Sequence, residues 1–149
     1  MKKWLFIIIA SLILLLSGCA TNHALIMPNK DFKSYKAAYI ELLQEDEFNI
    51  GTFTIQELSD MGFQVFNKRV PADPLATDML VRYTYAKSWD LSVYLVSYQI
   101  LFLDARSEAV IAQLGYRLNG NWRSSQTRKI EGFNELRSKL GYPPSKMVE

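Results

Sequence analysis

The side chains that most often carry out catalysis are scarce in this chain of 149 residues. It has one cysteine, Cys19, and one histidine, His23, both near its start. A Ser–His–Asp or Cys–His site needs a histidine beside the nucleophile in the folded domain, and a zinc site needs several such ligands. Because we expect His23 to lie in a tether, both kinds of site are excluded. The scattered glycines form no phosphate-binding loop, so we predict neither a metal nor a cofactor.

Acidic residues could still perform general acid–base chemistry. Asp90 could pair with Asp104 or Glu108, and two carboxylates within about 10 Å can hydrolyse a glycosidic bond. Each of these residues also falls at an expected strand end or turn, where acidic residues are common. The run Glu45–Glu47 is predicted to be a solvated turn. We therefore predict that the protein is not an enzyme, and keep an acidic-residue hydrolase as a third hypothesis.

The start of the chain has the pattern of a secretory signal peptide. Lys2 and Lys3 precede an uncharged, strongly apolar run from Trp4 to Leu16, and two small residues follow it. The alternative is a transmembrane helix, but as a helix this run would rise only about 20 Å, which is short of the hydrocarbon core. The pattern therefore favours a signal peptide over residues 1–18.

The segment Leu16-Ser17-Gly18-Cys19 resembles the lipobox of bacterial lipoprotein precursors. This resemblance implies cleavage between Gly18 and Cys19 and attachment of a diacylglyceryl group to the Cys19 sulfur. Two or three acyl chains, such as palmitate, would hold the protein durably on a membrane. Ala20 in place of aspartate implies the outer membrane, facing the periplasm, if the source has two membranes. The alternative is an ordinary secreted protein with a chance cysteine near its cleavage site.

Removal of the signal peptide changes the charge balance. The full chain has 17 basic and 15 acidic side chains, and Lys2 and Lys3 leave with residues 1–18. The rest is formally neutral, so nothing indicates nucleic-acid binding. Residues 19–149 suffice for one ordinary core. We expect a lipidated cysteine and flexible tether over residues 19–31, and a single domain over residues 32–149.

The pattern of residues 32–149 predicts an α+β domain: an antiparallel sheet of about four or five strands, including a three-strand meander, packed by two helices. A capping box at Thr54 and Glu57 predicts a helix over residues 55–61 that ends at Gly62. Ser125 or Thr127 is expected to cap a second helix that ends at Gly141. Strands are expected within residues 32–44, where helix competes, and over residues 63–66, 79–86, 91–104 and 108–118, with a connector over residues 87–90.

Two tryptophans flank predicted turns and are candidate contacts for a partner. Trp89 lies in the connector and Trp122 follows the meander; the alternative is that they close the two ends of the core. The strand over residues 91–104 is apolar on both faces, so we expect both faces to be covered. The domain resembles small uncharacterised envelope lipoproteins, notably in its hairpin over residues 101–112.

These observations lead to one preferred function and two alternatives. The preferred function is a non-enzymatic, membrane-anchored module that binds or assembles with another envelope protein. The first alternative is a carrier of an apolar ligand such as a lipid, held between sheet and helix. The second is the hydrolase described above.

Overall fold

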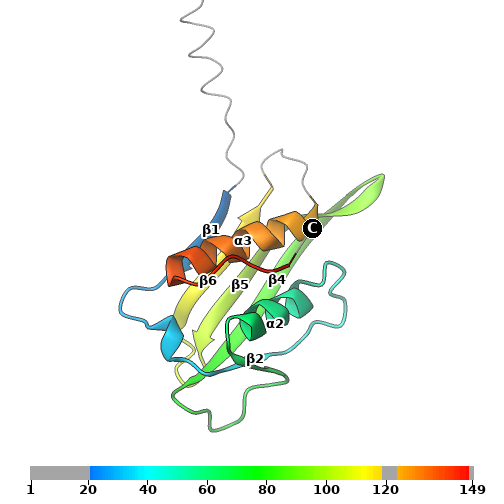
Figure 1. Ribbon diagram of the computed structural model, residues 1–149. Coiled ribbons are helices and arrows are strands. Elements are labelled where there is room, and N and C mark those ends of the chain that lie inside the picture. The colour runs from blue at the N-terminus through cyan, green and yellow to red at the C-terminus, as the bar shows by residue number, and fades with distance from the viewer. Residues whose placement is uncertain (1–20, 119–123, 148–149) are drawn as a thin grey trace, which may run out of the picture.

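The computed structural model describes residues 21–118 and 124–147. Two helices lie on one face of a six-stranded mixed sheet (Figure 1), whose strand order is β1-β6-β5-β4-β2-β3. The elements are β1 (Thr21–Ile26), the 3₁₀ helix η1 (Phe32–Ser34), β2 (Ala37–Ile40), α2 (Ile50–Asp60), β3 (Gln64–Asn67), β4 (Asp78–Asp90), β5 (Ser92–Asp104), β6 (Val110–Arg117) and α3 (Ser125–Leu140). The α+β class, the two helices and the meander of β4, β5 and β6 are confirmed.

The predicted antiparallel sheet of about four or five strands fits only roughly, because the sheet has six strands and two of its pairs are parallel. β2 pairs in parallel with both β3 and β4. The helix α2 connects β2 to β3, and a strand that returns after a helical crossover lies parallel to the strand it left. The sequence showed the strand–helix–strand order but not which strands become neighbours.

The first strand occupies part of the segment predicted to be a tether. β1 pairs antiparallel with β6, from Thr21 opposite Arg117 to Ile26 opposite Ala112. Its outer edge is closed by α3, because Glu135 accepts a hydrogen bond from the Ala24 amide at 3.1 Å. Lys139 donates to the Ala24 carbonyl. Residues 21–26 therefore belong to the sheet, and the tether prediction is wrong over these residues.

The helix α2 begins at Ile50, five residues earlier than the capping box predicted. Asp46, which was expected to be solvated, accepts hydrogen bonds from the amides of Ile50 and Gly51 at 2.9 and 2.7 Å, and so stabilises the first turn. Thr54 lies inside the helix and donates to the Ile50 carbonyl, so it is not the cap. The predicted end is confirmed, because Gly62 adopts φ +93° directly after the helix.

The helix α3 follows its prediction closely. Its cap is Ser124, whose side chain accepts a hydrogen bond from the Thr127 amide at 3.0 Å, rather than Ser125 or Thr127 itself. Gly141 ends the helix with φ +70°, as expected.

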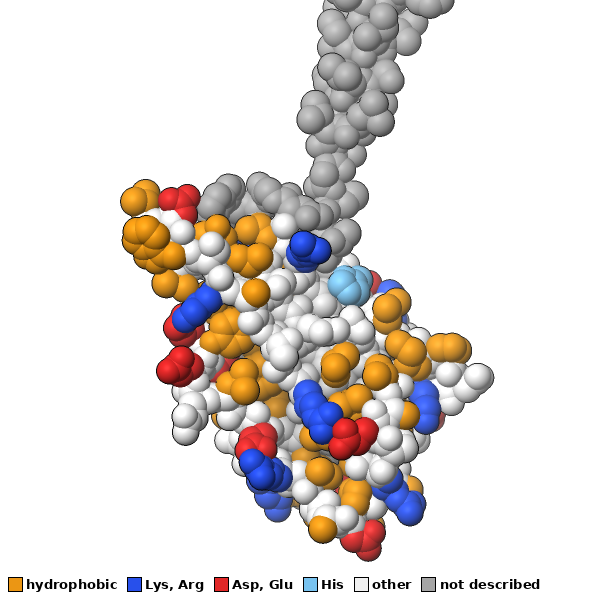
Figure 2. Space-filling model, turned by 180° about the vertical axis from the view of Figure 1, so that it is seen from behind, with side chains coloured by type: hydrophobic (Ala, Val, Ile, Leu, Met, Phe, Trp, Pro, Cys, Tyr) orange, Lys and Arg blue, Asp and Glu red, His pale blue; other side chains and the backbone are white. Residues whose placement is uncertain are grey.

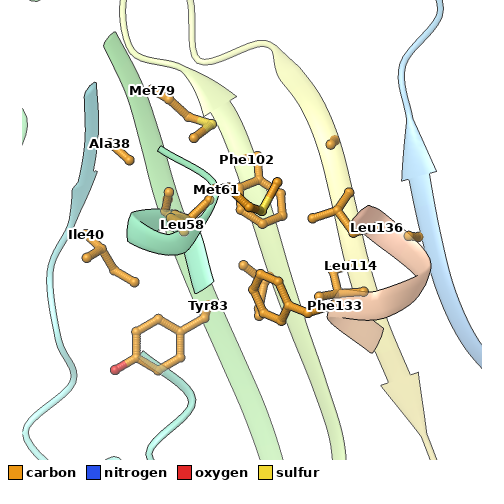
Figure 3. Packing of buried hydrophobic residues seen from close by; sticks show 14 of the residues in the cluster. Ala38, Ile40, Leu58, Met61, Met79, Tyr83, Phe102, Leu114, Phe133 and Leu136 are labelled. Carbon is orange, nitrogen blue, oxygen red and sulfur yellow. The ribbon is translucent and has the colours of Figure 1, made fainter. Parts of the chain in front are cut away.

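The core fills the space between the helices and the sheet (Figure 3). Phe53 of α2 meets Phe133 of α3 with ring centroids 5.6 Å apart. Phe32 contacts Phe63 and Phe102 edge-on, with centroids 5.5 and 5.3 Å apart. These aromatic side chains occupy the layer in which an apolar ligand was expected to lie, which argues against the carrier hypothesis in that form.

Candidate functional site

The Asp90–Asp104 pair does not form a catalytic centre. Asp90 lies opposite Ser92 at one end of the β4–β5 hairpin, and Asp104 lies opposite Met79 at the other. Asp104 lies twelve residues along β5 from Ser92, the partner of Asp90, which corresponds to about 40 Å of extended strand. A pair of hydrolytic carboxylates must face one substrate bond, so this pair is excluded.

Asp104 organises the turn between β5 and β6. It accepts hydrogen bonds from the amides of Arg106 and Ser107, from the Ser107 hydroxyl, and from the Tyr35 hydroxyl at 2.9 Å. Burial alone would raise the pKa of the Asp104 carboxyl, but the hydrogen bonds, chiefly those from Ser107, outweigh it and lower this pKa to about 2. Burial and the neighbouring carboxylate raise the pKa of Tyr35 to about 12.

The third acidic candidate has a different partner. Glu108 forms an exposed ion pair with Arg82, at 2.9 Å, and its amide donates to the Asp104 carbonyl. Within residues 21–118 and 124–147, no three His, Cys, Asp or Glu side chains gather where they could hold a metal ion. The carboxylates named from the sequence thus have structural roles in this turn and beside β4.

Of the other residues singled out in the sequence, some lie outside the part of the chain that the structure describes. Gly18, Cys19 and Trp122 lie outside the described residues. His23 is exposed on β1 (Figure 2) rather than in a tether. No helix in the described part of the chain has the length and hydropathy needed to cross a membrane.

Trp89 lies near the tip of a hairpin that projects from the sheet (Figure 1). Residues 87–90, expected to form a connector, continue β4 instead, and Leu91 alone joins Asp90 to Ser92. Trp89 is 71% exposed and Leu91 92% exposed, and Val93, opposite Trp89, is 49% exposed. Trp89 therefore does not close the core.

The sequence analysis missed Leu91 and Val93 as members of this tip. It assigned them to a strand with two covered faces. The available signal was the alternation of Ser88, Asp90 and Ser92 with apolar residues, which runs through the expected connector without a break.

The second face of the sheet is covered by none of the described helices (Figure 2). The described helices do not provide the cover that the sequence analysis expected for this face, and cover by a partner chain stays a prediction. A groove of about 630 Å³ lies on this face, beside β4 and the segments that follow β2 and β3. Its lining combines apolar and charged side chains: Leu42, Leu43, Val70, Leu80, Glu41, Lys68, Arg69 and Arg82. Three of these charged groups are basic and one is acidic.

No protein-family model and no curated protein matches this chain, but solved structures share its fold. A PDZ domain protein from Parabacteroides distasonis aligns with a TM-score of 0.50 and 13% identity over 86% of this chain and 36% of that one. This chain thus spans about a third of that protein. PelC from Paraburkholderia phytofirmans, solved as a dodecamer, aligns with a TM-score of 0.51 and 11% identity over 84% of this chain and 100% of that one. At these identities the likeness concerns the fold.

Proposed function

We propose that this chain is a bacterial envelope lipoprotein that acts as a non-enzymatic binding or assembly module. The anchor is Cys19, lipidated after cleavage behind Gly18. The lipobox resemblance supports this assignment. In a bacterium with two membranes, Ala20 favours the outer membrane and a domain that faces the periplasm.

The observation that carries the binding function is the uncovered sheet face with its groove. Leu42, Leu43 and Leu80 supply apolar contacts beside Lys68 and Arg82. The patch combines apolar side chains with basic ones, of which Arg69 and Arg82 also form exposed ion pairs with Glu41 and Glu108. Such a patch suits a protein segment that presents acidic and apolar residues together. We therefore assign the groove to a protein partner in the envelope.

The side chains that could have acted in catalysis are engaged elsewhere, which supports a function without catalysis. In this proposal Cys19 is blocked by lipid, and Asp104 is engaged by the turn that it organises. Glu108 is paired with Arg82. An assembly role draws support from the PelC structure, in which a domain of this fold forms a dodecamer.

Site-specific photocrosslinking in intact cells tests this function. A photoreactive phenylalanine analogue replaces Thr84, an exposed groove residue, or Gln56, an exposed residue of α2 on the other side of the sheet. We expect one protein adduct of defined mass from position 84, none from position 56, and loss of the adduct when Arg82→Glu is added. Identical adducts at both positions, or none, would contradict the proposal.

A further inference from the structure

The tip of the β4–β5 hairpin extends well beyond the rest of the sheet. Thr21, Arg117, Ser97 and Ala86 lie side by side across β1, β6, β5 and β4. Beyond this row the hairpin continues for five more residues of β5, which corresponds to about 16 Å. The start of β1 and the hairpin tip lie at the same end of the molecule (Figure 1).

The base of this hairpin is held by contacts with the segment before α2, and its exposed side chains gather toward the tip. Tyr85 donates a hydrogen bond to the Glu45 carbonyl, and its ring meets Phe48 with centroids 5.6 Å apart. Lys87 forms an ion pair with Glu47. These contacts fix the direction of the hairpin, so that the residues beyond Lys87 are presented on a rigid support.

The tip presents apolar side chains that stay exposed in the folded domain. Trp89 and Val93 lie opposite each other on adjacent strands, and Leu91 stands between them at the turn. Leu91 is 92% exposed and adopts φ +62°, a conformation that favours glycine and asparagine. Asp90 is the only charged residue between positions 88 and 96. Neither burial nor the conformation of the turn therefore accounts for a leucine at this position.

The proposed anchor places a membrane at this same end. Cys19 precedes Thr21 by two residues, and two residues of extended chain reach at most about 7 Å. The hairpin reaches roughly twice as far from the same row of residues. A bilayer that holds the lipid on Cys19 would therefore meet the hairpin tip.

We propose that Trp89, Leu91 and Val93 insert into the bilayer interface as a second membrane contact, which fixes the orientation of the domain. The inference rests on the proposed anchor at Cys19. Tryptophan prefers the membrane–water interface, with its ring among the headgroups. Leu91 is the residue that lies beyond Asp90 along the hairpin, whereas Trp89 and Val93 lie one residue nearer the sheet, on the opposite face of the strands from Asp90 and Ser92. In this orientation the Trp89–Val93 face and Leu91 contact the lipid, and the Asp90 carboxylate on the other face stays among the headgroups. With this end held down, the groove on the sheet face remains open to the aqueous compartment.

The test uses the full lipidated protein in vesicles of phosphatidylethanolamine and phosphatidylglycerol. Because the chain has a single cysteine, which the proposal blocks with lipid, an added cysteine is the only site for a polarity-sensitive dye. Leu91→Cys reports on the tip. Leu75→Cys is the matched control, a leucine 68% exposed in the loop before β4, at the opposite end of that strand.

At position 91 we expect a blue-shifted emission that nitroxide-labelled lipids quench and aqueous iodide does not. The dye at position 75 should respond to iodide alone. An aqueous signal at position 91, or equal lipid quenching at both positions, overturns the inference. A dye at position 91 that is shielded in native membranes but aqueous in pure lipid also overturns it, in favour of a protein contact.

The parent protein separates this inference from the proposed function. If the parent, without an added cysteine, takes up dye or fails to float with vesicles, the anchor itself is wrong and the inference fails with it. If the parent floats unlabelled and position 91 remains aqueous, only the second contact is wrong.

Discussion

Glu57 of α2 and Arg137 of α3 form an ion pair in which the two side chains are 0% and 2% exposed. Arg137 Nε donates to Glu57 Oε2 at 2.6 Å, and Arg137 Nη1 donates to the Pro143 carbonyl at 3.1 Å. Ser145 Oγ contacts the other carboxylate oxygen. The pair joins both helices and the C-terminal segment above the sheet, and every partner is hydrogen-bonded.

Removal of one member of this pair should destabilise the fold strongly. Arg137→Met leaves the Glu57 carboxylate buried without its counter-charge, which costs about 3–5 kcal/mol. Urea unfolding followed by circular dichroism measures the loss. The double variant Glu57→Leu with Arg137→Met should lose less than Arg137→Met alone, since it leaves no buried charge.

The exposed pair Arg69–Glu41 provides a matched control. These side chains are 84% and 59% exposed, so Arg69→Met should change stability by less than about 1 kcal/mol. Equal losses for Arg69→Met and Arg137→Met would show that the buried network does not hold the helices together.

Replacement of Leu91 should separate stability from membrane contact. Leu91→Asn relieves the strain of positive φ and should stabilise the fold by about 1 kcal/mol, measured as a higher melting temperature. The same change removes an apolar side chain from the tip and should reduce lipid quenching of a dye at the neighbouring position 92. A variant that loses stability and keeps its quenching would refute the role given to this leucine.

The turn at Asp104 should make stability depend on pH in acid. The pKa of Asp104 is about 2 in the folded protein and about 3.9 in an unfolded chain. Its contribution is therefore complete above about pH 4 and is lost as the pH falls toward 2, amounting to about 1–2 kcal/mol after solvent screening. Stability curves of Asp104→Asn should lack this component. If the plots of unfolding free energy against pH for the unchanged protein and for Asp104→Asn stay parallel from pH 2 to pH 6, Asp104 does not make this contribution.

The closed edge of β1 should keep the protein from self-association. Glu135 accepts a hydrogen bond from the Ala24 amide and Lys139 donates one to the Ala24 carbonyl. Without these bonds the two backbone groups would be open to pairing with a strand of another molecule. Glu135→Ala with Lys139→Ala should increase the apparent mass in size-exclusion chromatography at high concentration. Arg82→Ala with Glu108→Ala removes an exposed pair from the sheet face and should leave the mass unchanged, which serves as the control.

The positions of most helices and strands were predictable from the sequence, whereas the pairing of the strands with one another was not. Gly62 and Gly141 identified the helix ends because positive φ is a local property. The parallel pairs of β2 and the pairing of β1 with β6 arise from contacts between distant residues, which no local pattern contains. Thr54 and Glu57 matched a capping box, but tertiary contacts place both inside the helix, with Glu57 bound to Arg137.

The candidate site was predictable only in part. Trp89 was named as a candidate partner contact from its place beside a turn; its exposure removes the alternative that it closes the core, and the contact itself stays a prediction. The groove could not be foreseen, because its lining comes from three separate segments. Asp90 and Asp104 have the right side chains for a carboxylate pair, but they lie at opposite ends of the β4–β5 hairpin, and the length of β5 keeps them too far apart to act together.

The central claim is the lipid anchor on Cys19, and the mass of the N-terminal peptide of the purified membrane-bound protein tests it most directly. We predict a peptide that begins at Cys19 and carries a diacylglyceryl group, and the loss of both features together with membrane attachment in Cys19→Ser. An unmodified N-terminus at any other residue, or a Cys19→Ser protein that is still acylated and membrane-bound, would contradict the account.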